Sequence, residues 1–228
     1  MDSNRFKELF FEVFSENVEK KEKIQKFYDD VVKRYSVKNR YYHNLEHIYS
    51  MCDYWEMYKH KFEYPNYVFY AIIYHDIIYK TRPGYMSSSE QMSAMYFFYE
   101  VFDKKWFNLN SGFGSYIMLL IESTEHVNRS KTRMPSMKNS EVKLLLDIDL
   151  SIIGSSEEEY NTYCKNIRKE YNFYPNFLYN KGRLDVLQEL LKREKIFLTK
   201  EFSKFEKKAR INIQNEINLL TSPKKKYG

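Results

Sequence analysis

Glycine and proline are scarce in this sequence, with only 6 Gly and 5 Pro among 228 residues. A protein of many short strands needs more of these turn-forming residues, so a many-stranded β protein is disfavoured. Hydrophobic residues make up 43% of the chain, which is enough for a substantial core at this length. We therefore predict an all-α fold that forms a single domain over residues 1–228.

Cysteines and long apolar runs are also scarce. Cys52 and Cys164 lie far apart without metal-ligand spacing, so we expect free thiols in a reducing compartment. The sequence contains no run of about twenty apolar residues, and its charged N-terminal stretch is unlike a signal peptide. We therefore expect a cytoplasmic protein without a membrane partner. The net charge of +6 is dispersed apart from Lys224–Lys226 in the basic tail, which argues against a nucleic-acid partner.

The most unusual stretch is Tyr67–Tyr79, YVFYAIIYHDIIY, an apolar run that contains the polar pair His75-Asp76. Its β-branched and aromatic content suits a strand, but it is longer than most strands and has no other strand candidate to pair with. We predict a buried helix over Tyr67–Tyr79. A buried carboxylate needs a compensating cation or hydrogen-bond donors, so this pair points to a partner such as a metal ion.

Apolar spacings of three and four residues predict about nine helices. Asn44 is a plausible N-cap, Ser88 or Ser89 another, and Ser155-Ser156 before Glu157–Glu159 marks a further helix start. Two helices are expected within Ser3–Tyr35, with a break near Ser15–Val18, and a third runs through Ile48–Tyr58. The later ones are Tyr67–Tyr79, Glu90–Phe102, Ser115–Thr124, Ser140–Ile153, a helix to Tyr171, Pro175–Arg193 and Glu201–Leu220. Loops are expected at Thr81–Ser89, Asn108–Gly114 and Asn128–Asn139.

Three sets of imidazole and carboxylate groups lie in or beside apolar segments. His43 and His47 are four residues apart, which on a helix puts them on nearly the same face. His75-Asp76 lies in the apolar run, and Asp147 and Asp149 lie within LLLDIDLSII. Each set alone fits a hydrogen-bonded core residue or a helix cap. Together they form a ligand set suited to Fe, Mn, Zn, Ni, Co or Mg.

These residues follow the pattern of a known family. The chain resembles the HD-domain superfamily of metal-dependent phosphohydrolases, in which a His, a His-Asp pair and a distant Asp lie on a helical bundle. More narrowly, it is similar to the branch described as predicted metal-dependent HD phosphohydrolases. The resemblance covers residues 20–220 and rests on RYYHNLEHI (Arg40–Ile48), AIIYHDIIY (Ala71–Tyr79), SEQMSA (Ser89–Ala94), STEH (Ser123–His126), LLDIDLSIIG (Leu145–Gly154), IRKEY (Ile167–Tyr171), GRLDVL (Gly182–Leu187) and EKKARINIQNEI (Glu206–Ile217).

The resemblance implies an HD-type bundle and a set of site residues. The implied metal ligands are His47, His75, Asp76 and Asp149, with His43 and Asp147 as alternative ligands or as groups that orient them. His126 and Glu90 are implied as catalytic groups with Asp76, against the alternatives of a surface histidine and a first-turn acid. Arg40, Arg168 and Arg183 are implied phosphate contacts, against the alternative of internal salt bridges, for instance with Glu170. The chain has Ser89-Glu90 where the branch typically has Asn-Glu, so specificity can differ here.

The implied activity is hydrolysis of a nucleotide or another small phosphate ester with a divalent metal ion as cofactor. Two alternatives stay open. An HD-type di-iron oxygenase would use further ligands such as His43, His126 and Glu90. A nucleotide-sensing protein would keep the metal site without turnover. The sequence indicates neither the metal nor the oligomeric state.

Overall fold

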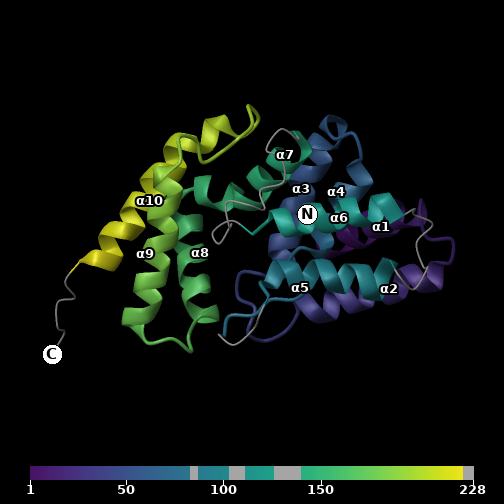
Figure 1. Cartoon of the computed structure of the whole chain (residues 1–228), viewed down its shortest axis with the longest axis horizontal. Helices are drawn as coiled ribbons and strands as arrows, with labels where there is room; N and C mark the ends of the chain where they lie inside the picture. The colour runs from purple at the N-terminus through teal and green to yellow at the C-terminus, as the bar shows by residue number, and fades with distance from the viewer. Residues whose placement is uncertain (83–86, 103–110, 126–139, 223–228) are drawn as a thin grey trace. The chain divides into compact units, whose positions relative to one another are not determined.

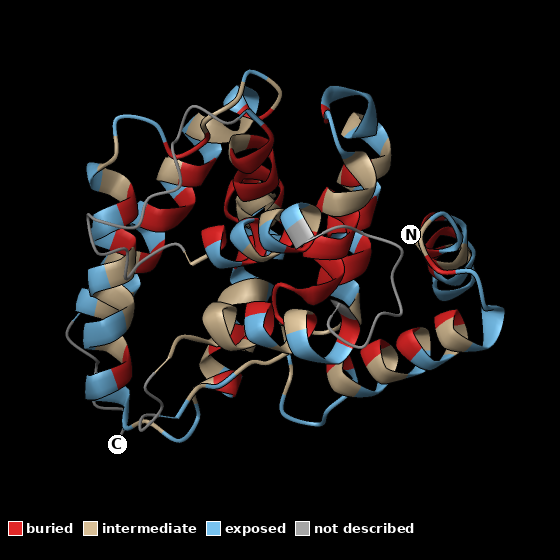
Figure 2. Cartoon of the chain, turned by 45° about the vertical axis from the view of Figure 1, so that its right-hand side comes forward, coloured by how far each residue is buried: buried red, intermediate tan, exposed pale blue. Residues whose placement is uncertain are grey.

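The computed structural model describes residues 1–82, 87–102, 111–125 and 140–222. Within these ranges the regular structure consists of ten α-helices and four short 3-10 or π segments, with no strand (Figure 1). The prediction of an all-α fold is confirmed, and the described residues form ten α-helices where about nine were expected. Buried residues occur along most of these helices, and most helices also carry exposed residues (Figure 2).

The chain divides into two compact units, Met1–Asp149 and Leu150–Gly228. The single HD-type domain expected from the sequence stays a prediction, and we describe each unit by itself. Among the described residues, no helix is both long and apolar enough to span a membrane.

The first unit begins with two helices that pack through aromatic side chains. Helix α1 (Ser3–Ser15) starts at Asp2, whose carboxylate accepts from two backbone amides, and helix α2 (Lys21–Tyr35) follows after a short break. The expected interruption near Ser15–Val18 is therefore confirmed. On α1, the Phe10 and Phe14 rings stack with centroids 3.9 Å apart, and both side chains are fully buried.

Helix α3 (Leu45–Tyr58) starts where the sequence indicates. The Asn44 side chain accepts from the backbone amides of Glu46 at 3.0 Å and His47 at 3.4 Å, which confirms Asn44 as the N-cap. His47 is consequently in the first turn of α3, and His43 precedes the helix. The expectation that both histidines lie on one helix face is wrong, because the capping residue separates them.

Helix α4 (Pro65–Tyr74) is the central helix of the first unit, and every residue from Val68 to Tyr74 is buried. The helical interpretation is confirmed, but the expected end at Tyr79 is wrong. The helix ends at Tyr74, and His75-Asp76 follow it in a turn. Side chains from elsewhere in the first unit bind the carbonyls at this end, so the chain can leave the helix without orphaned acceptors.

The described part of the first unit contains three further helices, α5 (Ser89–Tyr96), α6 (Ser111–Ser123) and α7 (Ser140–Asp149). Ser88 caps α5 in a capping box with Gln91, and a π segment, Phe97–Phe102, continues it. The expected loop at Asn108–Gly114 is wrong from Ser111 onward, because α6 begins there. The expected loop at Asn128–Asn139 lies outside the described residues. A 3-10 segment, Leu150–Gly154, follows α7.

The second unit contains α8 (Glu157–Glu170), α9 (Asn176–Lys192) and α10 (Glu206–Thr221), with α9 and α10 side by side (Figure 1). A capping box between Ser156 and Glu159 starts α8, as the sequence predicts. Helix α10 begins at Glu206 instead of Glu201, since a 3-10 turn, Ser203–Phe205, precedes it. The Asn212 amide donates to the carbonyls of Ile153 and Ser155 at 3.0 and 3.1 Å, which ties α10 to the start of this unit.

Candidate metal centre

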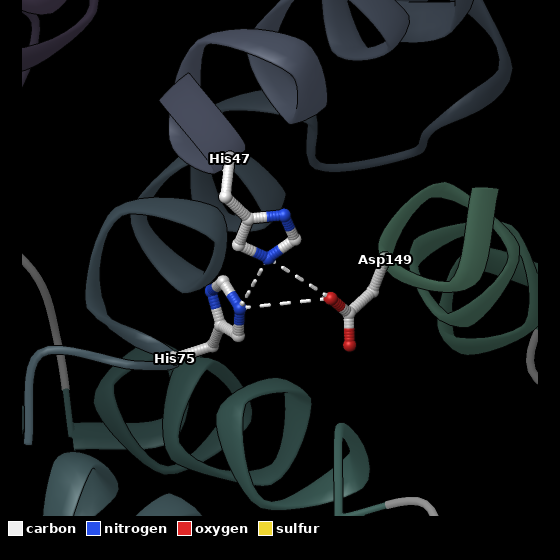
Figure 3. A group of neighbouring side chains, drawn as sticks. All are labelled: His47, His75 and Asp149. Atoms are coloured by element: carbon white, nitrogen blue, oxygen red, sulfur yellow. Dashed lines mark hydrogen bonds and ion pairs between the residues drawn. The ribbon is translucent and has the colours of Figure 1, made fainter. Parts of the chain in front are cut away.

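Three helices of the first unit bring one imidazole or carboxylate each to a common point. His47 comes from the first turn of α3, His75 directly follows α4, and Asp149 is the last residue of α7. Figure 3 shows both imidazole rings and the Asp149 carboxylate pointing toward one another. One ligand atom from each residue lies within 4.8 Å of the other two. These three residues are the His47-His75-Asp149 cluster.

The separations within the cluster match those of ligands that share one ion. His47 Nε2 lies 3.3 Å from His75 Nε2 and 3.2 Å from Asp149 Oδ1, and His75 Nε2 lies 3.7 Å from that oxygen. Two atoms bound to one ion at about 2.0–2.2 Å, with tetrahedral or octahedral angles, lie about 2.8–3.6 Å apart. Two distances fall in this interval and the third is just above it. The donor set of two imidazole nitrogens and a carboxylate oxygen therefore fits a divalent transition metal.

The His75 ring is held in the orientation that a metal ligand requires. Its Nδ1 lies 2.9 Å from the carbonyl oxygen of Ile72. A carbonyl can only accept, so Nδ1 carries the hydrogen and Nε2 is the atom that faces the cluster. A backbone acceptor on the far ring nitrogen is the usual partner of a metal-binding histidine.

His75 carries the positive charge that balances the carboxylates around it. Burial by itself lowers the pKa of His75, but the charges of Asp76 and Asp149 outweigh it and raise that pKa to about 9. Burial lowers the pKa of His47. Without a metal, a proton on His75 supplies the positive charge between the carboxylates. A cation bound at the two Nε2 atoms would replace this proton.

Asp76 lies beside the cluster and contacts His75. Its Oδ2 lies 3.1 Å from His75 Nε2 and 4.0 Å from His43 Nε2, and the residue is 6% exposed. Burial raises the pKa of the Asp76 carboxyl, but the charges of His75 and His43 outweigh it and the pKa is lowered. Asp76 is thus a buried carboxylate beside two imidazoles. Its place as the fourth metal ligand stays a prediction.

The alternative ligands that the sequence left open lie at different places in the first unit, and the choice between them stays a prediction. His47 and Asp149 lie in the cluster with His75, whereas His43 approaches Asp76 and Asp147 is fully buried on α7. The His43 ring stacks on Tyr79 with centroids 4.1 Å apart. His43 and Asp147 are therefore adjacent to the cluster in the chain without being part of it.

Glu90, a candidate catalytic residue, lies in the first turn of α5. Burial raises the pKa of its carboxyl, and the charges of Asp76 and Glu125 raise it further. Glu90 therefore keeps a proton to a higher pH than an ordinary glutamate does. His126, the other candidate, lies outside the described residues.

The three arginines expected to contact phosphate all bind groups of the protein. Arg40 donates to three backbone carbonyls, and Arg168 donates to the carbonyls of Tyr171 and Tyr174. Arg183 forms a two-point ion pair with Glu216 instead of the suggested Glu170. Arg183 therefore has the internal salt bridge that was the alternative, whereas Arg40 and Arg168 bind backbone carbonyls. The phosphate role of all three stays a prediction.

Sequence reasoning missed two aromatic residues beside the histidines and one acid at the start of α4. The Tyr42 ring lies 4.9 Å from the His47 ring, and Tyr79 holds the His43 ring. Glu141 accepts from the backbone amide of Tyr64 at 2.9 Å, immediately before α4. Tyr42 and Tyr79 are part of the motifs that carry the resemblance, but Glu141 has no local signal because its partner is 77 residues away.

Comparisons of the chain with protein-family models, with curated proteins and with solved structures find no match.

Proposed function

We propose that this chain is a metal-dependent phosphohydrolase of the HD type, which acts on a nucleotide or another small phosphate ester. The observation that carries the proposal is the meeting of His47, His75 and Asp149 at separations suited to one ion. The sequence order, a His, then His-Asp, then a distant Asp, supports the same family. His47, His75 and Asp149 would hold a divalent ion, with Asp76 beside them.

A bound divalent ion lowers the pKa of water from 15.7 toward about 7 and neutralises charge on phosphoryl oxygens. The chain supplies the surroundings that this chemistry needs. His75 keeps Nε2 aimed at the cluster through the bond from Nδ1 to Ile72. The Asp76 carboxylate stays ionised because its pKa is lowered, and it can accept a hydrogen bond from an attacking water. The raised pKa of Glu90 suits a carboxyl that donates a proton to a leaving group.

The first test is elemental analysis combined with a metal-supplemented screen of nucleotides and phosphate esters. We expect one or two metal equivalents in the wild-type chain and phosphate release that Asp76→Ala abolishes. Asp29→Ala, on the exposed face of α2, is the matched control and should keep both properties. Full hydrolysis by metal-free protein would refute the proposal.

The ligand assignment has its own controls in the neighbouring residues. His47→Gln and Asp149→Asn should lose bound metal, because each removes a member of the cluster. His43→Gln and Asp147→Asn should retain it. The opposite pattern would transfer the assignment to His43 and Asp147. Oxygen uptake with bound iron, and no phosphate release, would favour a di-iron oxygenase, whereas tight nucleotide binding without turnover would favour a sensor.

A further inference from the structure

Arg40 connects the two chain segments that carry the histidine ligands. Its Nη1 donates to the carbonyl oxygens of His43 at 3.0 Å and Asp76 at 2.7 Å, and its Nη2 donates to that of Ile77 at 3.0 Å. His43 belongs to the turn that enters α3, and Asp76 and Ile77 belong to the turn that leaves α4. One guanidinium therefore fixes both turns.

Two aromatic rings hold the guanidinium in place. Arg40 Cζ lies 4.8 Å from the centroid of Tyr35 and 5.8 Å from that of Tyr79. The Tyr35 hydroxyl also donates to the carbonyl of Ile73 at 3.0 Å, in the last turn of α4. Since Tyr79 also stacks on the His43 ring, these contacts join α2, the entrance to α3 and the end of α4.

The hydrogen bonds from Arg40 give partners to backbone carbonyls at the end of α4 that have none within the helix. Carbonyls beyond the last turn have no intrahelical donor, and a buried one without a partner costs about 1–3 kcal/mol. Ile77 is 1% exposed and Asp76 is 6% exposed, so water is largely excluded from both residues. Lysine cannot reproduce the three bonds, because its ammonium is a compact point charge and arginine has a planar fork.

We propose that Arg40 is a positioning residue that holds His47 and His75-Asp76 in register, so that the metal site is formed before the ion binds. This inference rests on the proposed function, and it replaces phosphate binding as the expected role of Arg40. Partners that orient metal ligands typically contribute a factor of about 10–100 in metal affinity. We expect the loss of the Arg40 contacts to weaken metal binding by a factor of this size.

The test compares Arg40→Lys with a control that loses the same kind of contact elsewhere. Arg168 donates to the carbonyls of Tyr171 at 2.8 Å and Tyr174 at 3.0 Å, and its Cζ lies 4.7 Å from the Tyr179 centroid, all within the second unit. Arg168→Lys therefore removes a carbonyl-binding arginine without altering the cluster. Both variants keep the positive charge and should lose comparable stability.

Titration of Co²⁺ into the full chain measures affinity by calorimetry, and the visible absorption of bound cobalt reports the ligand geometry. We expect Arg40→Lys to weaken Co²⁺ binding about 10–100-fold and to change the spectrum, and Arg168→Lys to leave both unchanged. If Arg40→Lys does not fold, Tyr79→Leu removes one ring beside the guanidinium and should weaken binding in the same direction.

The outcomes separate this inference from the proposed function. If the wild type does not bind Co²⁺, the metal site is refuted and the inference with it. Wild-type binding with unchanged affinity and spectrum in Arg40→Lys, or in Tyr79→Leu where that variant is used, would overturn the inference alone. An increase in substrate KM at unchanged Co²⁺ affinity would likewise overturn it and restore the phosphate role. Equal weakening in Arg168→Lys would show a general effect of stability and also overturn it.

Discussion

The ion pair between Arg183 and Glu216 gives a prediction that can be worked out from the structure. Arg183 Nε donates to Glu216 Oε1 at 2.8 Å, Nη2 donates to Oε2 at 3.0 Å, and the Tyr160 hydroxyl donates to Oε2 at 2.6 Å. The Arg183 and Glu216 side chains are 10% and 8% exposed. Because water is largely excluded, each charge depends on the other for its solvation.

Glu216→Gln keeps the shape of the side chain but removes its charge and places an amide NH₂ near the donors of Arg183. Removing one partner of a buried ion pair costs about 3–5 kcal/mol, and we expect the free energy of unfolding to fall by that amount. Tyr160→Phe is the matched control, because it removes one hydrogen bond to the same carboxylate and leaves the pair intact. We expect it to cost about 2 kcal/mol.

Urea unfolding followed by circular dichroism measures both losses, and amide hydrogen exchange in α8–α10 localises them to the second unit. A loss below about 1 kcal/mol for Glu216→Gln, the range of an ordinary surface change, would refute the reasoning. It would mean that the charge of Arg183 does not depend on Glu216 for its stabilisation. Its guanidinium would then be available for the phosphate contact that the family resemblance implies.

The same pair predicts a pH dependence. Burial by itself raises the pKa of Glu216, but the hydrogen bonds and charge of Arg183 outweigh it, so the pKa is lowered. A lowered carboxyl pKa means that the unfolded chain binds the proton more readily than the folded one. The contribution is fully present above the ordinary glutamate pKa of about 4.3 and is lost as pH falls through the folded pKa. Urea unfolding at several pH values should show that the free energy of unfolding falls less at acid pH in Glu216→Gln than in the wild type.

Three further predictions concern packing, capping and metal. A Cβ on Gly154 would come within 2.6 Å of Phe205 Cβ and 3.3 Å of the Phe197 ring, so Gly154→Ala should cost about 1–3 kcal/mol in thermal unfolding. Ser156→Ala removes the acceptor of the Glu159 amide and should cost about 1 kcal/mol by the same assay; an unchanged Tm would contradict the capping role. A divalent ion at about 100 times its Kd should stabilise the wild-type chain by about 2.7 kcal/mol, and a stability unaffected by metal would count against the site.

The helices were predictable where local chemistry determines them. Asn44 and Ser156 cap the helices that follow them, as their positions in the sequence predict. The end of α4 was not predictable from its own residues, because Ile77 and Ile78 continue the apolar pattern. That end depends on Tyr35 and on other side chains distant in sequence, whose contacts no local pattern shows.

The candidate site was partly predictable for a related reason. Polar residues within apolar runs marked His75-Asp76 and the Asp147–Asp149 segment as places where burial needs a partner. The selection of His47 over His43 depends on the point at which α3 begins, since the Asn44 cap leaves His43 outside the helix. The arginines were harder to interpret. Arg183 and Glu216 are 33 residues apart, and sequence spacing does not indicate which acid pairs with which arginine.

The His47-His75-Asp149 cluster lies where helices begin or end. We therefore expect different effects from variants of the residues that bind these helix ends and from variants of the cluster itself. Helix ends have backbone groups that need partners from elsewhere, so a residue such as Arg40 would stabilise the fold and orient the proposed ligands through the same contacts. Changing them should lower stability and metal affinity together. His47→Gln changes a proposed ligand without touching those backbone bonds, and it removes a buried imidazole whose pKa is lowered by burial. It should abolish metal affinity while leaving the metal-free chain about as stable as the wild type.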